Sequence, residues 1–138
     1  MAATRVAIDT MYAIDLLARE DMMPLANLIA SGKVMGILST ITIAELVKVL
    51  GQKDEGRMKA AVDRLLTSEL VVSNVTYGIA HLAGMLGLRH SIPTADSIIA
   101  ATGIIHGAKH ILTDDAHFSA VKGRIKPVDY RQFMALCR

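Results

Sequence analysis

The sequence predicts a single α/β domain with a central, mostly parallel sheet of about five strands and helices on both faces. Short apolar segments alternate along the chain with helical patterns of about 9 to 14 residues, which is typical of a parallel sheet covered on both faces. The 138 residues show no internal repeat, no low-complexity segment and no evident linker. One domain spanning residues 1–138 is therefore expected.

Five short apolar runs predict the strands. Each is only a few residues long and nearly continuous in hydrophobic character, as buried parallel strands are. In chain order they are residues 6–8, 34–38, 70–72, 110–112 and 125–128. The first run ends at Asp9, and the fourth is followed closely by Asp114 and Asp115.

Helices are expected between these strands, and several have recognisable ends. Pro24 suits the first turn of a helix that stops at Gly32. Asn74 is a candidate cap for a helix of moderate propensity, and Gly107 suits the C-terminal end of the next one. The expected helices cover residues 11–17, 24–31, 42–50, 54–66, 75–88, 94–106 and 130–136, with a turn or short helix at 116–121.

The composition excludes several classes of protein. No apolar run approaches the roughly 20 residues of a membrane helix, and no signal peptide is evident. The single cysteine, Cys137, excludes an internal disulfide and makes a cysteine-based zinc site untenable. We therefore expect a cytoplasmic protein with no membrane attachment. The 52% hydrophobic content favours a core plus a buried face between identical subunits. A net charge of +2 neither supports nor excludes nucleic-acid binding.

Several acidic residues are expected at one edge of the sheet. Asp9 and the Asp114–Asp115 pair follow strands directly. Glu45 and Asp96 lie near the starts of helices that follow extended segments. Because ligands of open parallel sheets gather at the carboxyl ends of the strands, four carboxylates could converge there from distant parts of the chain.

Such a cluster favours a bound cation. Two like charges 4 Å apart repel by roughly 4 kcal/mol at an effective dielectric constant of 20. Oxygen ligands without cysteine suit Mg²⁺ or Mn²⁺. An ion of this kind, which keeps several waters, suits the hydrolysis of phosphodiester bonds.

Most of these acids also have a purely structural explanation. Thr42 and Glu45 have the spacing of a capping box, in which Glu45 would bond the backbone amide of Thr42. Asp96 would be favoured by the helix dipole, and the Asp114–Asp115 pair could cap the turn that follows. Asp9 is less easily explained in this way, because the next residue could cap that helix. The joint arrival at one edge favours the functional explanation.

At these residues the chain resembles the PIN-domain ribonucleases, and specifically the VapC-type toxins of toxin–antitoxin pairs. The resemblance rests on four segments that come in the order and spacing of that family. They are residues 6–10 (VAIDT), 39–46 (STITIAEL), 95–102 (ADSIIAAT) and 112–118 (LTDDAHF).

The resemblance implies a PIN-like nuclease domain that uses Mg²⁺ or Mn²⁺ to hydrolyse RNA through a metal-oriented water. It also implies a homodimer, and inhibition by a small VapB-type antitoxin whose tail enters the active-site groove. By resemblance the catalytic acids are Asp9, Glu45, Asp96 and Asp115, the metal ligands among them are Asp9, Asp96 and Asp115, and the supporting residues are Thr10, Thr113 and Asp114.

Three residues depart from the pattern of the family. Met11 stands where many members carry a small hydroxyl residue, and Asp114 occupies a variable position. His117 stands where many members carry a further acid. Of the five histidines, His117 is the one that lies only two residues beyond Asp115.

Two other functions compete with the toxin. One is a PIN-like fold that binds RNA or protein without catalysis, although such a module has no need for clustered negative charge facing an anionic ligand. The other is a solitary RNA-processing nuclease, which an adjacent antitoxin gene would distinguish from a toxin. An aspartate-nucleophile phosphatase is excluded, because it needs a second acid at the position of Met11.

Overall fold

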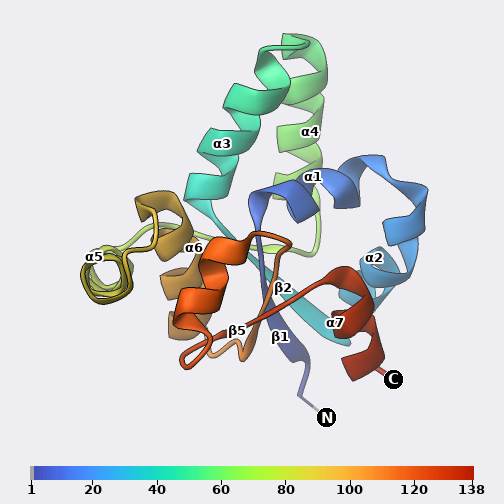
Figure 1. Ribbon diagram of the computed structural model, residues 1–138. Helices are drawn as coiled ribbons and strands as arrows, with labels where there is room; N and C mark the ends of the chain where they lie inside the picture. The colour runs from blue at the N-terminus through green and yellow to red at the C-terminus, as the bar shows by residue number, and fades with distance from the viewer. Residues whose placement is uncertain (1) are drawn as a thin grey trace.

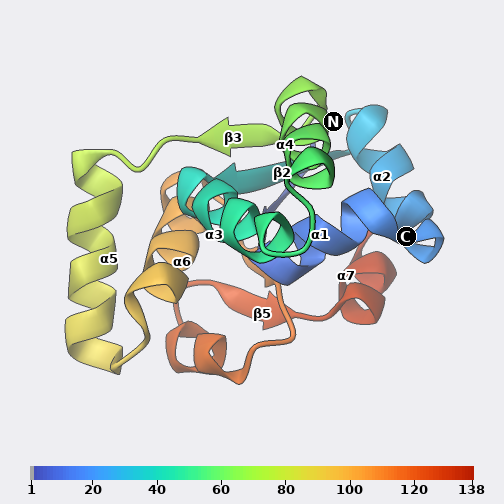
Figure 2. The same ribbon diagram turned by 90° about the horizontal axis from the view of Figure 1, so that it is seen from above.

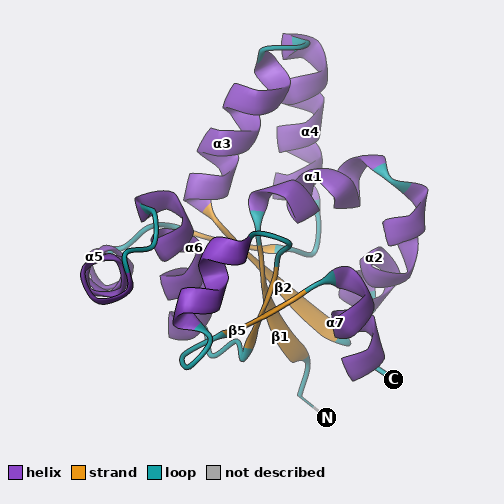
Figure 3. Cartoon of the chain, in the orientation of Figure 1, coloured by secondary structure: helices purple, strands orange, loops and turns teal. Residues whose placement is uncertain are grey.

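The computed structural model describes residues 2–138 and confirms the expected α/β fold. Five parallel strands form one sheet in the order β3-β2-β1-β4-β5, shown in the centre of the molecule in Figure 3. The strands are β1 (Thr4–Ile8), β2 (Val34–Ser39), β3 (Val71–Ser73), β4 (His110–Leu112) and β5 (Lys126–Val128). Pro127 lies in β5, an edge strand, where the missing amide hydrogen is tolerated.

Helices cover both faces of the sheet. The residues of β1 alternate between them: Val6 and Ile8 enter one hydrophobic core, and Ala7 enters the other. The first core is shared with α1 (Thr10–Ala18), α2 (Met23–Ala30), α3 (Thr40–Gly51), α4 (Glu55–Thr67) and α7 (Tyr130–Leu136). The second is shared with α5 (Tyr77–His90), α6 (Thr94–Ile105) and the 3-10 helix η2 (Ala116–Val121). A further 3-10 turn, η1 (Glu20–Met22), precedes α2.

Helices α3, α4 and α5 extend beyond the sheet (Figure 1, Figure 2). The hairpin of α3 and α4 projects past the carboxyl ends of the strands, at the top of Figure 1. Helix α5 lies at the periphery and packs mainly on α6 (Figure 2). Among residues 2–138, no helix is both long and apolar enough to cross a membrane.

Three expected helix starts are wrong. Helix α3 begins two residues early, because the hydroxyl of Ser39 accepts from the amide of Ile41 at 3.1 Å and caps it. Helix α5 begins late and is capped by Thr76, not by Asn74. The amide of Val75 donates to the hydroxyl of Thr40 at the start of α3. This bond holds Val75 next to α3, so the segment does not form a helical turn at that residue. Helix α1 is capped by Asp9 itself.

The strand order places a switch point beside β1. The chain builds outward from β1 through β2 to β3, and then returns to the other side of β1 to form β4 and β5. Ligands of open α/β sheets bind outside the carboxyl ends of the strands at such a point. The loops after β1 and β4 therefore meet where the fold favours a site.

The close approach of α6 to β1 requires a glycine at position 103. A Cβ there would lie 2.8 Å from the Cβ of Ala7 and 2.6 Å from the Cδ1 of Ile125. The backbone of β1 holds the Ala7 atom in place, so the clash cannot be relieved by a rotamer change. Gly84, inside α5, has nothing within 4 Å of a Cβ and is a matched control.

We expect Gly103→Ala to lower the free energy of unfolding by about 1–2 kcal/mol through overpacking. Gly84→Ala should raise the free energy of unfolding by up to about 1 kcal/mol, because alanine is the better helix former. Urea denaturation followed by circular dichroism measures both. An equal change in the free energy of unfolding for both substitutions would show that helix propensity alone determines it, and would contradict the overpacking at position 103.

Candidate functional site

The loops after β1 and β4 bring Asp9 and Thr113 side by side. The register pairs Ile8 with Leu112, and the amide of Asp9 continues the ladder by donating to the carbonyl of Leu112 at 3.0 Å. The hydroxyl of Thr113 then donates to Oδ2 of Asp9 at 2.7 Å. The other oxygen, Oδ1, accepts from the amide of Thr10 at 2.8 Å. Both oxygens of Asp9 are thus oriented by the fold.

The same threonine also orients Asp115. The backbone amide of Asp115 donates to the hydroxyl of Thr113 at 2.9 Å, so this buried hydroxyl joins the two loops. Oδ1 of Asp115 accepts from the amide of His117 at 2.9 Å and caps η2. The capping explanation of Asp115 is therefore correct, and it coexists with a place in the cluster.

Asp96 approaches this group from the first turn of α6. The Nδ1 atom of His117 lies 3.3 Å from Oδ2 of Asp96 and 3.0 Å from Oδ1 of Asp115. One oxygen from each acid and one ring nitrogen of His117 lie within 4.8 Å of one another. The spacing of the histidines in the sequence did not reveal His117 as a ligand candidate, because one of its two partners, Asp96, comes from a distant segment.

Glu45 reaches the site through Thr10. The hydroxyl of Thr10 donates to Oε1 of Glu45 at 2.6 Å and lies 3.3 Å from the hydroxyl of Thr42. Because α3 begins at residue 40, Glu45 lies in its second turn and not in a capping box. Its carboxylate faces α1 across the gap between the two helices. The supporting position expected for Thr10 thus has a defined contact.

Asp114 lies at the margin of the group. Its Oδ1 accepts from the hydroxyl of Tyr12 at 2.7 Å, and that hydroxyl accepts from the amide of Tyr130 at 3.0 Å. Burial, and then the hydrogen bond to Asp114, raise the pKa of Tyr12 to about 12, so the phenol stays protonated and donates. Of the two consecutive acids, Asp115 lies against Asp96, whereas Asp114 is bound to Tyr12.

These side chains line one open cavity of about 390 Å³ at the carboxyl edge of the sheet. It is lined by Asp9, Thr10, Met11, Tyr12, Asp15, Glu45, Val49, Asp96, Asp114 and Asp115. Asp15 and Tyr12 were missed from the sequence. The helical period of α1 could have indicated them, because residues three and four apart lie on the same face of a helix. Met11 and Asp15 are four residues apart, and Tyr12 and Asp15 are three apart.

The four acids expected from the sequence have no lysine or arginine partner in the described part of the chain, whereas Asp15 pairs with Arg19. Among residues 2–138, no lysine or arginine forms an ion pair with Asp9, Glu45, Asp96 or Asp115. Burial raises the pKa of Asp9, and the neighbouring carboxylates of Asp115 and Glu45 add to that effect. Burial, Asp115 and Asp9 together raise the pKa of Asp96 to about 6, although His117 opposes the shift. A bound divalent cation would relieve this repulsion, so the donor set fits Mg²⁺ or Mn²⁺.

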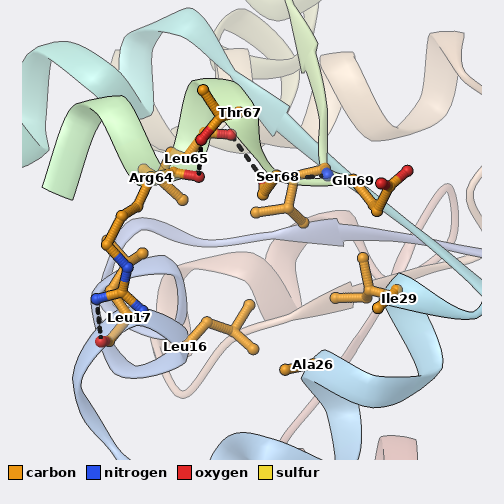
Figure 4. Close-up of a pocket in the computed structure, with 11 residues that line it drawn as sticks. Leu16, Leu17, Ala26, Ile29, Arg64, Leu65, Thr67, Ser68 and Glu69 are labelled. Carbon is orange, nitrogen blue, oxygen red and sulfur yellow. Dashed lines mark hydrogen bonds between the residues drawn. The ribbon is translucent and has the colours of Figure 1, made fainter.

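A second cavity, of about 350 Å³, lies on the face covered by α1, α2 and α4 (Figure 4). Its walls are mainly aliphatic and include Leu16, Ile29 and Leu65. The guanidinium of Arg64 is held on one side by the carbonyl of Leu17 at 2.9 Å. This cavity has no cluster of carboxylates among its lining residues, so it is not the candidate metal site.

Comparison with known proteins agrees with this geometry. The sequence matches the PIN domain family over residues 6–124, and no curated protein matches it. The fold is similar to a chain of DNA-bound VapBC from Salmonella typhimurium, with 20% identity, a TM-score of 0.75, and coverage of 92% of this chain and 98% of that one. It is also similar to VapBC-1 of nontypeable Haemophilus influenzae, with 19% identity, a TM-score of 0.71, and coverage of 93% and 99%.

The raised pKa of Asp96 gives a pH dependence of stability. The folded state binds this proton more tightly than the unfolded state, so the free energy of unfolding falls as pH rises from about 4 to about 6. In chelator at pH 7 we expect Asp96→Asn to melt at a higher temperature than the parent protein. The difference should shrink towards pH 4, where the parent carboxyl is protonated.

Scanning calorimetry at several pH values measures this difference. Asp63→Asn, at an exposed position on α4, removes the same charge outside the cavity and should show little dependence on pH. A lower melting temperature for Asp96→Asn at every pH would contradict the electrostatic argument.

Proposed function

The chain belongs to the PIN domain family, and from that membership we propose that it is a divalent-metal-dependent endoribonuclease, the toxin of a VapBC-type toxin–antitoxin pair. The observation that carries this proposal is the convergence of Asp9, Glu45, Asp96 and Asp115 on one cavity at the switch point of the sheet. Mg²⁺ and Mn²⁺ are the ions that such a set of oxygen ligands favours.

Each acid has a role in this proposal that follows from its contacts. Asp9, Asp96 and Asp115 would hold the ion, because all three line the cavity and the charge of Asp115 acts on both Asp9 and Asp96. When bound there, a divalent ion eases deprotonation of a water and offsets negative charge on the phosphate. Thr113 fixes the orientation of two of these acids, so it is a positioning residue.

Glu45 stands apart from the other three acids. Only its Oε1 is engaged, by the hydroxyl of Thr10. Its other oxygen accepts no hydrogen bond within residues 2–138, and it borders the cavity from α3. We assign to it the acceptance of a proton from the attacking water, with Thr10 holding the carboxylate in place.

The surroundings of the cavity support an RNA substrate. The projecting α3–α4 hairpin carries Lys48 one turn beyond Glu45, Lys53 in the connecting loop and Arg57 at the start of α4. These exposed cations would contact phosphates of a strand that enters the cavity. Arg5, by contrast, donates to the carbonyl of His106 and lies outside the cavity.

A small VapB-type antitoxin is the proposed protein partner. Solved structures that share the fold include VapBC2 of Rickettsia felis and VapBC-5, a member of the VapBC family of toxin–antitoxin systems, of Mycobacterium tuberculosis. A short open reading frame beside this gene, whose product inhibits the nuclease in a purified mixture, would support the pair. A gene without such a neighbour would favour a solitary RNA-processing nuclease.

A homodimer is also proposed, on the strength of an exposed apolar surface. Helix α5 presents Tyr77 and Leu88 at 85% and 77% exposure, and it lies at the edge of the molecule (Figure 2). The two side chains lie near opposite ends of this helix, and exposed apolar side chains along a peripheral helix favour a contact between subunits.

The proposed nuclease gives a graded prediction for two substitutions. Asp9→Asn should abolish detectable cleavage of a single-stranded RNA in Mg²⁺ or Mn²⁺, because it removes a charged metal ligand. Thr113→Val removes only the hydroxyl that orients Asp9 and Asp115, and should lower the rate by about 10–100-fold. Single-turnover assays with a labelled RNA measure both rates.

A buried threonine away from the site is the control. The hydroxyl of Thr102 bonds only the carbonyl of Ile98 within α6, so Thr102→Val should leave the rate near that of the parent protein. Cleavage that persists in excess chelator, or in Asp9→Asn, would refute the mechanism. RNA binding without cleavage by the parent protein would favour a non-catalytic binding module.

The proposed dimer is tested by charge on α5. We expect a dimer at micromolar concentration in sedimentation velocity, and Leu88→Arg should shift it towards monomer by burying an unpaired charge. Leu136→Arg, at another exposed apolar position on α7, should leave the dimer intact. A parent protein that sediments only as a monomer would contradict this surface assignment.

A further inference from the structure

His117 occupies a distinctive place in the carboxylate cluster. Its Nδ1 atom lies 3.0 Å from one oxygen of Asp115 and 3.3 Å from one oxygen of Asp96. The ring therefore turns inward towards both acids although the side chain is 61% exposed. No other nitrogen among residues 2–138 belongs to a group of clustered ligand atoms.

The local backbone fixes this orientation. The amide of His117 donates to Oδ1 of Asp115, and the following residue, Phe118, is fully buried in the core. The residue is thus anchored on both sides within η2. The side chain therefore starts from a fixed backbone position beside the two carboxylates.

The Nδ1 atom of His117 has the spacing of a neighbouring ligand from each of the two carboxylate oxygens. Ligands about 2.0–2.2 Å from a metal, at the angles of octahedral or tetrahedral coordination, lie about 3.0–3.4 Å apart. The two distances from Nδ1 fall in this range. One ion placed among Asp96, Asp115 and His117 would be bound by two oxygens and one nitrogen with little rearrangement.

We propose that His117 is a metal ligand that makes this site prefer Mn²⁺ over Mg²⁺. Imidazole nitrogen binds first-row transition metals well, whereas Mg²⁺ favours oxygen ligands and retains its waters. A neutral nitrogen in place of a further carboxylate also lowers the negative charge that Mg²⁺ requires. The inference rests on the proposed role of Asp96 and Asp115 in holding a divalent ion.

Calorimetric titration of the metal-free full chain with Mn²⁺ and with Mg²⁺ tests the preference without RNA. We expect His117→Asp to lower the ratio of Mn²⁺ to Mg²⁺ affinity by about tenfold or more, by weakening Mn²⁺ binding and strengthening Mg²⁺ binding. His117→Ala should weaken Mn²⁺ binding. His81→Asp, at an exposed position on α5, makes the same charge change outside the site and should leave the ratio unchanged.

Pulsed electron paramagnetic resonance of the Mn²⁺-loaded protein identifies the ligand directly. The parent protein and His81→Asp should show coupling of the ion to a nitrogen-14 nucleus, and both His117 variants should lose it. An unchanged affinity ratio without nitrogen coupling would overturn the proposal and make His117 only a counter-charge for the two acids. So would a parent protein that binds neither ion.

These results are separate from those of the nuclease assay. A protein that binds Mn²⁺ through His117 but cleaves no RNA would contradict the proposed function and leave the ligand assignment intact. If the parent protein cleaves RNA and His117→Asp leaves the metal preference unchanged, the ligand assignment is contradicted and the proposed function is supported.

Discussion

The hydroxyl of Thr113 is the contact on which the arrangement of the site depends. It donates to Asp9 and accepts from the amide of Asp115, so one buried atom sets the distance between the loops after β1 and β4. The contact exists because these strands are neighbours in the sheet, with Ile8 paired to Leu112. A strand order in which β1 and β4 were not neighbours would separate two acids, Asp9 and Asp115, that are more than one hundred residues apart in the sequence.

Capping and chemistry prove to be compatible uses of the same side chains. Asp9 caps α1 and Asp115 caps η2, and each does so at the carboxyl edge of the sheet. A carboxylate at the start of a helix is stabilised by the amide hydrogens there. That stabilisation partly offsets the repulsion within the cluster. The capping hydrogen bonds of Asp9 and Asp115 therefore help to hold a metal-binding arrangement in the folded protein.

The sequence predicted the sheet and its acidic edge because both follow from local rules. A buried strand that ends in an acid can be recognised within a few residues, as at Asp9. The place of Glu45 at this edge was expected, but the contact that its side chain makes could not be derived in this way. Its contact with Thr10 depends on Ser39 starting α3 two residues early and on the angle at which that helix crosses α1. Asp15 and Tyr12 were missed for a related reason: their places on the cavity depend on the direction in which α1 leaves the sheet.

His117 shows why the charge of the site must be considered as a whole. Burial, and then the neighbouring carboxylates, already raise the pKa of Asp9 and of Asp96. A fifth acid at position 117 would increase that repulsion whenever no cation is bound. An imidazole close to Asp96 and Asp115 instead lowers the pKa of Asp96 relative to its value without the histidine. The departure from the family pattern therefore makes the folded chain less dependent on a bound ion, while it keeps a donor atom at the position where an acid would otherwise bind one.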